Sequence, residues 1–221
     1  MPAPRRDPLA KHRRHLAEVP DDFLHEKLKL LRVDPDEFAK LPPIVISGQR
    51  RPVTIAPDGA KPAKLLDVKP HMRRISPDSL DELKELAGQP NRVVAFDPEP
   101  ESRLPKVDAA RVAKLRGAKA FKNLDAEQRD VFWTAAQRLL HGSSGPDVLA
   151  DAGYQRVAEL MLGLASGIGL LLSSDLIVAT GQRVDFSGFG ILYFNNVLVY
   201  GTGSIRMGGN AKMHAYQVSH V

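Results

Sequence analysis

Apolar and small or polar residues alternate along the C-terminal section, residues 175–221. The alternation is clearest in the pairs Val184/Phe186, Val197/Val199 and Ile205/Met207, and turn segments such as Gly201-Thr202-Gly203 separate the pieces. A period of two is typical of strands that bury one face. We therefore predict short strands whose buried side chains are Val184, Phe186, Val197, Val199, Ile205, Met207 and Met213.

The composition of this section narrows the predicted fold. Only five charged residues lie from Asp175 onward, all 17 prolines lie at or before Pro146, and 13 of the 17 glycines lie at or after Gly142. Glycine permits tight corners, whereas proline is excluded from inner strands because it lacks a backbone N–H. The stretch GTGSIRMGGNAKMHA is similar to rungs of bacterial β-solenoid proteins. The prediction is a β-roll or short β-solenoid, with a small β-sandwich as the alternative.

The preceding part of the chain shows helical spacing and helix-capping signals. Asp34 followed by Pro35 predicts one helix start, and Asp125 with Gln128 three residues later predicts another. Gly88 is expected to end a helix in the left-handed conformation. The apolar run Leu160–Leu172 has the length of a buried helix.

Two stretches of this part are expected to be extended. Ile44–Ile46 and Val53–Ile55 flank a Ser-Gly turn, which predicts a hairpin, and Arg92–Phe96 predicts one further strand. The whole pattern predicts an α+β protein, a helical N-terminal region with a β-hairpin followed by an all-β C-terminal section. The predicted divisions are a basic arm (1–19), helices with the hairpin and proline-rich connectors (20–124), a helical pair with the apolar run (125–174) and the glycine-rich β section (175–221).

Charge singles out the N-terminal arm. The formal net charge is +5, and the first 16 residues hold five basic side chains against one acidic one. A basic arm can bind the phosphates of a nucleic acid or another polyanion, and it can equally be a solvated tail. We expect the arm to be peripheral, exposed and dispensable for folding. Its candidate phosphate-binding residues are Arg5, Arg6, Lys11, Arg13 and Arg14.

Candidate catalytic chemistry is sparse. The absence of cysteine excludes disulfides and thiol catalysis. The segment GTGSIRMGG does not match a dinucleotide fingerprint, because Arg206 stands where the third glycine is needed. The carboxylates Asp97, Glu99 and Glu101 follow a predicted strand, but the prolines between them favour an extended linker. We therefore predict no catalytic residue, no cofactor and no metal site, with a carbohydrate-binding or carbohydrate-active protein as an alternative.

The low charge of the β section favours self-association over enzymatic chemistry, because poorly charged strand edges attract other strands. We predict a non-enzymatic structural or self-assembling protein of bacterial or phage origin that forms a homo-oligomer. A nucleic-acid-binding module that uses the arm and a membrane-active protein that uses residues 160–172 are the alternatives. No apolar segment follows the N-terminal charges, so a cytoplasmic or virion-associated location is favoured over secretion through a signal peptide. The predicted interface residues are Tyr193, Tyr200, Tyr216 and Val221.

Overall fold

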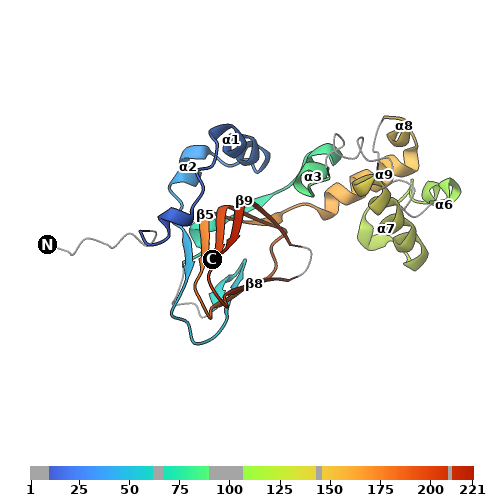
Figure 1. Cartoon of the computed structure of the whole chain (residues 1–221). Helices are drawn as coiled ribbons and strands as arrows, with labels where there is room; N and C mark the ends of the chain where they lie inside the picture. The colour runs from blue at the N-terminus through green and yellow to red at the C-terminus, as the bar shows by residue number, and fades with distance from the viewer. Residues whose placement is uncertain (1–9, 62–66, 90–106, 143–145, 209–210) are drawn as a thin grey trace. The chain divides into compact units, whose positions relative to one another are not determined.

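The chain forms two compact units (Figure 1). The computed structural model describes residues 10–61, 67–89, 107–142, 146–208 and 211–221. The first unit combines Met1–Ile75 with Ile168–Val221, and the second is Ser76–Gly167. All strands of the described residues lie in the first unit, and the described part of the second unit is helical.

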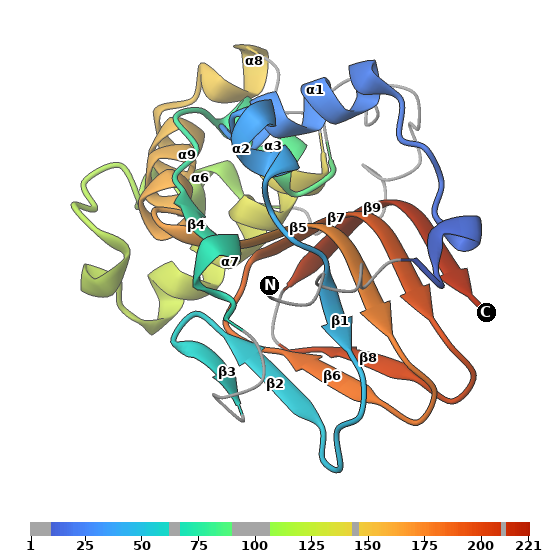
Figure 2. The same ribbon diagram turned by 90° about the vertical axis from the view of Figure 1, so that its left-hand side faces the viewer.

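The larger sheet of the first unit is mainly parallel (Figure 2). Its path is β1 (Ile44–Ile46), β5 (Ile168–Val178), β7 (Ile191–Val199) and β9 (Lys212–His220), each strand parallel to its neighbours. The short strand β4 (Met72–Ile75) pairs antiparallel with the first part of β5. The register joins residues of β5, β7 and β9 that lie 21 positions apart, so neighbouring strands repeat the same layout of side chains.

The second sheet of this unit is mixed. Its order is β3 (Gly59–Lys61), β2 (Val53–Ala56), β6 (Arg183–Phe186) and β8 (Ser204–Met207), and only the pairing of β3 with β2 is antiparallel. From β5 to β9 the chain visits the two sheets in turn. Side chains from both sheets form one hydrophobic core, which includes Ile44, Ile55, Leu176, Phe186, Phe194 and Val197.

Helical segments of the N-terminal part complete the first unit. They are the 3-10 helices Arg13–His15 and Lys69–His71 and the α-helices α1 (Asp21–Leu30) and α2 (Pro35–Ala39). The predicted start of α2 is confirmed, because the Asp34 carboxylate accepts hydrogen bonds from the backbone N–H groups of Asp36 and Glu37. Phe38 of α2 is buried, and its ring contacts Tyr193 of β7 with 5.6 Å between centroids.

The second unit packs its helices around a core of its own. They are α3 (Leu80–Leu86), α6 (Ala109–Ala113), the 3-10 helix Phe121–Asn123, α7 (Ala126–His141), α8 (Pro146–Leu149) and α9 (Ala152–Leu164). The predicted capping box at α7 is confirmed, with Asp125 and Gln128 each bonding the backbone of the other. Gly88 has a φ of 65° after α3, as predicted. The core includes Val112, Leu115, Phe132, Leu139 and Val157.

The predicted fold class is wrong. The protein is a mixed α/β structure with the parallel sheet β1-β5-β7-β9, helices between its strands and a second mixed sheet. The C-terminal section is therefore not a separate all-β section, a β-roll or a β-solenoid, because β1 to β4 from the N-terminal half complete both sheets. The alternating pair Val197/Val199 belongs to the end of the longer strand β7, which buries both faces along most of its length.

Three local predictions also need comment. The hairpin is wrong, since β1 and β2 pair with β5 and β6 in different sheets. The apolar run is not one helix, because α9 ends at Leu164 and β5 begins at Ile168 after Gly167, whose φ is 74°. Arg92–Phe96 lies outside the described residues. Within the described ranges, no helix is both long and apolar enough to cross a membrane.

Candidate assembly interface

The inner face of the larger sheet becomes exposed at its last strand. Ile44, Leu176, Val197 and Val218 lie side by side in register across β1, β5, β7 and β9. The first three side chains are 0% exposed, whereas Val218 is 61% exposed. The sequence therefore continues an apolar core row into a position where nothing in the described chain covers it.

The second sheet shows the same change at β8. Ile55, Phe186 and Met207 are aligned in register across β2, β6 and β8. Ile55 and Phe186 are almost fully buried, but Met207 is 42% exposed. Large apolar side chains that are exposed next to a buried core are typical of sites where another protein surface packs.

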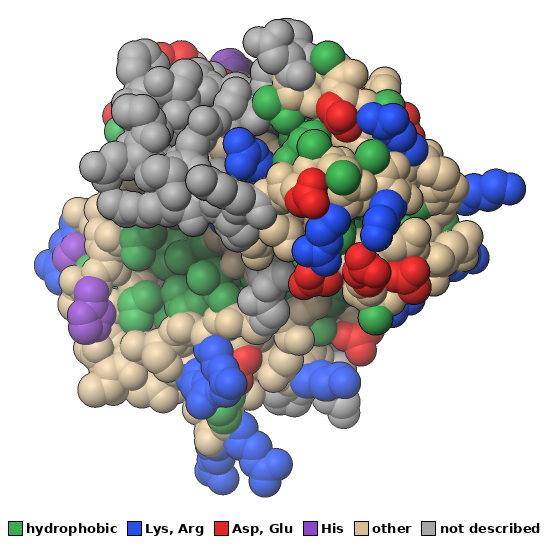
Figure 3. Space-filling model, turned by 90° about the vertical axis from the view of Figure 1, so that its right-hand side faces the viewer, with side chains coloured by type: hydrophobic (Ala, Val, Ile, Leu, Met, Phe, Trp, Pro, Cys, Tyr) green, Lys and Arg blue, Asp and Glu red, His purple; other side chains and the backbone are tan. Residues whose placement is uncertain are grey.

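The two sheets end at the same side of the first unit, and they end unequally (Figure 2). Strand β9 is the last strand of the larger sheet and β8 is the last strand of the second sheet, so after β8 the chain adds one more strand to the larger sheet and none to the second. The half-buried side chains of Ile205, Met213 and Ala215 pack against the core here. Figure 3 shows hydrophobic side chains gathered in a hollow on this side. We call the set Ile205, Met207, Met213, Ala215 and Val218 the open end.

The opposite, outer face of the larger sheet carries a row of polar side chains. Asp175, Asn196 and Gln217 are aligned in register across β5, β7 and β9. The Asn196 Nδ2 donates to Asp175 Oδ1 at 2.8 Å, and both residues are buried. Burial raises the pKa of Asp175 above its usual value, although the hydrogen bond from Asn196 opposes this shift. We call these three residues the polar row.

The polar row holds part of the N-terminal arm. The Ala17 N–H donates to Asn196 Oδ1 at 3.0 Å and to Gln217 Oε1 at 2.9 Å, and the Ala17 carbonyl accepts from Asn196 Nδ2 at 3.3 Å. His12 is 5% exposed, and its Nδ1 lies 2.9 Å from the hydroxyl oxygen of Tyr200. Burial lowers the pKa of His12. The arm is thus docked from His12 to Ala17, contrary to the expectation that it is peripheral throughout.

The four tyrosine and valine residues predicted as an interface have different surroundings. Tyr193 is buried under α2, and burial raises its pKa to about 12. The ring of Tyr200 is half-buried against His12. Tyr216 is 43% exposed but packs on Phe23 of α1. Val221 is 41% exposed. The outer face is therefore largely covered by the chain itself, and the exposed apolar surface lies at the open end instead.

The remaining predicted site residues can also be placed. Of the predicted inner residues, Val184, Phe186 and Val197 are buried in the core between the sheets, and Val199, Ile205 and Met213 are half-buried against it. Of the predicted phosphate-binding residues, Lys11, Arg13 and Arg14 are exposed, whereas Arg5 and Arg6 lie outside the described residues. They stay candidates without a site around them.

The described residues show little catalytic chemistry. No cluster of His, Asp or Glu with the arrangement of a metal site occurs among them. His71 is the most deeply buried histidine of that part of the chain, and its Nδ1 donates to the Leu172 carbonyl at 2.8 Å. This bond fixes the ring against β5, and within the described residues the Nε2 of His71 makes no hydrogen bond.

Sequence reasoning missed the polar row and the position of the open end. The polar row has a signal in the sequence, because Asp175, Asn196 and Gln217 recur every 21 residues inside otherwise apolar strands. The open end has a weaker one, since its side chains alternate like those of any strand with a buried face. Comparison with protein-family models, with curated proteins and with solved structures found no match to this chain.

Proposed function

We propose that this protein is a self-associating structural protein that joins a second copy of itself through the open end. The main support is that Val218 and Met207 are exposed, whereas the residues aligned with them in the neighbouring strands are buried. Fully burying a valine or methionine side chain contributes about 1.5–3 kcal/mol. A symmetric dimer buries Val218 and Met207 of both copies, which favours association by several kilocalories per mole. The entropy lost on association opposes this gain.

The unequal ends of the two sheets favour a second copy as the partner. In each copy the chain adds β9 to the larger sheet after β8 and adds no further strand to the second sheet, so one more strand can pair beside β8. In a dimer with two-fold symmetry, the larger sheet of each copy can meet the second sheet of the other copy. Strand β9 of each copy then lies beside β8 of the other copy. Both sheets then continue across the interface, and the inner faces of the two β9 strands cover each other. Such an interface is closed, so it gives a dimer and not a fibre.

Backbone hydrogen bonding supports the same arrangement. In the described chain, no further strand pairs with the outer edges of β8 and β9. Unpaired edges readily accept a further strand. The inner side chains at this edge carry no acidic group, and Arg206 alternates with Ile205 and Met207, so it lies on the other face of β8. Charge repulsion between the two apolar faces is thus small.

Sedimentation velocity over a dilution series tests the proposal. We expect the parent protein to dimerise at micromolar concentration and above, and the dimer to persist in high salt because apolar burial drives it. Val218→Lys should be monomeric at every concentration, since it places a charge in the interface at a position exposed within one copy. Ser47→Lys is the matched control, because Ser47 is exposed and directly follows β1, at the other side of the sheet.

The outcomes are distinct. A parent protein that stays monomeric at the highest concentration contradicts the proposal. Equal behaviour of Val218→Lys and Ser47→Lys would show association through another surface. Association that disappears in high salt would indicate contact through charged groups, such as the exposed basic side chains of the arm, and not through the open end.

A further inference from the structure

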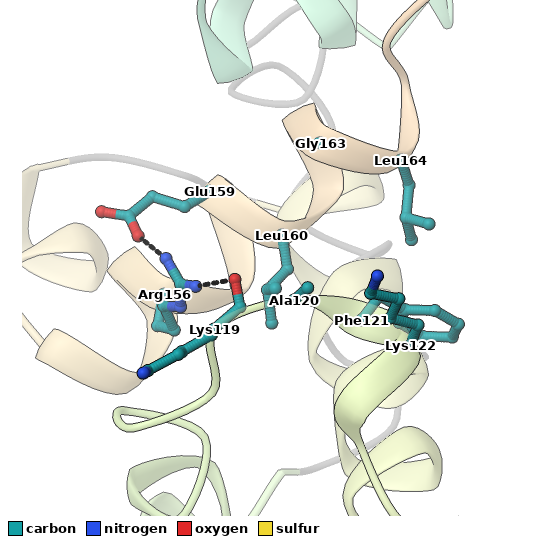
Figure 4. Close-up of a pocket in the computed structure, with 9 residues that line it drawn as sticks. All are labelled: Lys119, Ala120, Phe121, Lys122, Arg156, Glu159, Leu160, Gly163 and Leu164. Atoms are coloured by element: carbon teal, nitrogen blue, oxygen red, sulfur yellow. Dashed lines mark hydrogen bonds and ion pairs between the residues drawn. The ribbon is translucent and has the colours of Figure 1, made fainter.

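The second unit contains a pocket that the proposed self-association does not use (Figure 4). It has a volume of about 380 Å³ and lies between the C-terminal half of α9 and the segment 119–122. Small-molecule sites in proteins start at about 300 Å³. The pocket is lined by Lys119, Ala120, Phe121, Lys122, Arg156, Glu159, Leu160, Gly163 and Leu164.

One wall of the pocket is apolar. Leu160 and Leu164 project from α9 toward the segment that carries Ala120 and Phe121 (Figure 4). Leu164 is 46% exposed, so a ligand in the pocket could cover its side chain. Behind this wall, the Phe121 ring contacts Trp133 with 5.4 Å between centroids. The apolar wall can pack against the hydrocarbon part of a ligand. Binding can then be followed by the fluorescence of Trp133.

The charged side chains around the pocket are mostly basic. Arg156 is engaged by the protein, since it donates to the carbonyls of Ala118 and Lys119 and to the Glu159 carboxylate. Lys119 and Lys122 are exposed, and the Lys122 ammonium points toward Leu164 (Figure 4). Arg156 offsets the charge of Glu159, the one acidic residue of the lining, so the two lysines leave the pocket positive.

Gly163 is an exposed residue of the pocket lining. It lies in the last turn of α9, where alanine would favour the helix by about 0.5–1 kcal/mol. A Cβ built at Gly163 meets no atom within 4 Å, so the packing of the protein does not require glycine there. Its φ is outside the left-handed region as well. A side chain at this position would therefore project into open space beside the pocket lining.

We propose that this pocket binds a medium-chain carboxylate. The hydrocarbon chain lies against Phe121, Leu160 and Leu164, and the carboxylate faces the Lys122 ammonium, with Lys119 adding to the positive potential. The apolar wall provides the affinity, and the lysines select an anion over a cation of the same shape.

Titration of the full-length protein with octanoate, followed by Trp133 fluorescence and calorimetry, tests this proposal. Octyltrimethylammonium carries a similar hydrocarbon chain with the opposite charge. We expect octanoate to bind more tightly than this cation. Lys122→Glu should weaken octanoate binding about tenfold, which corresponds to about 1.4 kcal/mol, and should reduce the preference for the anion. Gly163→Leu should abolish binding by filling the pocket, whereas Gly163→Ala should retain it.

Each result bears on the proposal. No binding of octanoate to the parent protein at millimolar concentration overturns it. Equal binding of the anion and the cation, or unchanged binding by Gly163→Leu, also overturns it. A cooperative urea unfolding transition of Trp133 fluorescence in each variant shows that the second unit is folded, so a loss of binding is assigned to the pocket.

Discussion

Replacing Asn196 by alanine tests the polar row that holds the arm to the sheet. Asn196 is 4% exposed and sits between Asp175 and Ala17. The substitution removes a hydrogen bond to a buried carboxylate and two bonds to the backbone of Ala17. It also leaves Asp175, which is 6% exposed, without its amide donor.

The expected cost follows from these contacts. A hydrogen bond to a charged group contributes about 1.5–3 kcal/mol, and each neutral backbone bond about 1 kcal/mol. Asn196→Ala should therefore lower the free energy of unfolding of the first unit by about 3–5 kcal/mol. Gln217→Ala is the matched comparison, because Gln217 is half-buried and gives Ala17 a single bond that Asn196 duplicates. Its cost should be about 1 kcal/mol.

The pH dependence provides a second measure of the same contact. The pKa of Asp175 is raised by burial, so its contribution to stability is present below the ordinary value of 3.8 and is lost as the pH rises through the folded-state pKa. Loss of the Asn196 donor raises the pKa of Asp175 further. The difference between Asn196→Ala and the parent should consequently be larger at neutral pH than below pH 3.8.

Urea unfolding followed by far-ultraviolet circular dichroism measures these differences. Trp133 is the single tryptophan and lies in the second unit, so its fluorescence follows that unit as an internal reference. If Asn196→Ala and Gln217→Ala both cost less than about 1 kcal/mol, the polar row does not stabilise the first unit and the reasoning is refuted.

Two further predictions concern glycine in α9 and the docked histidine. Gly153→Ala should destabilise the second unit by about 1–3 kcal/mol, because its Cβ would lie 2.8 Å from the carbonyl oxygen and Cγ1 of Val112, whereas Gly163→Ala should stabilise it by about 0.5–1 kcal/mol. Urea unfolding followed by Trp133 fluorescence compares them, and similar effects of the two substitutions would contradict this assignment. The pKa of His12 is lowered by burial, so its contribution is present above pH 6.5 and lost as the pH falls through the folded-state pKa. The first unit should lose stability on acidification below pH 6.5, and a profile unchanged by His12→Gln would contradict this.

Local structure was predictable where a few neighbouring residues determine it. The caps at Asp34 and Asp125 satisfy backbone N–H groups within one turn of helix, and Gly88 supplies a positive φ that other residues avoid. The alternation of Val184 with Phe186 likewise follows from the two-residue period of a strand. Each of these signals is contained in a short stretch of sequence.

Strand partners were not predictable in the same way, because pairing joins residues that are distant in sequence. Ile44–Ile46 and Val53–Ile55 resemble a hairpin, but β1 pairs with β5 and β2 pairs with β6, each more than 100 residues away, and the near partner of β2 is β3. The run Leu160–Leu172 is apolar throughout, so hydrophobicity alone could not show that Gly167 separates a helix from a strand.

The candidate interface could be predicted from the sequence only in part, for a related reason. Alternation indicates which side chains share a face, but whether the face is covered depends on where the opposite sheet ends. Val197 and Val218 occupy equivalent positions in β7 and β9, yet one is buried and the other exposed. The docking of the arm was missed because Ala17 is held through its backbone, and backbone hydrogen bonding leaves no mark in composition.

Hydrogen exchange at two protein concentrations tests self-association through the open end most directly. In the proposed dimer, the edges of β8 and β9 form hydrogen bonds with the other copy, so their amides should exchange more slowly in the concentrated sample. Amides of β1 and β2 should exchange at the same rate in both samples. Exchange in β8 and β9 that does not depend on concentration would contradict the account.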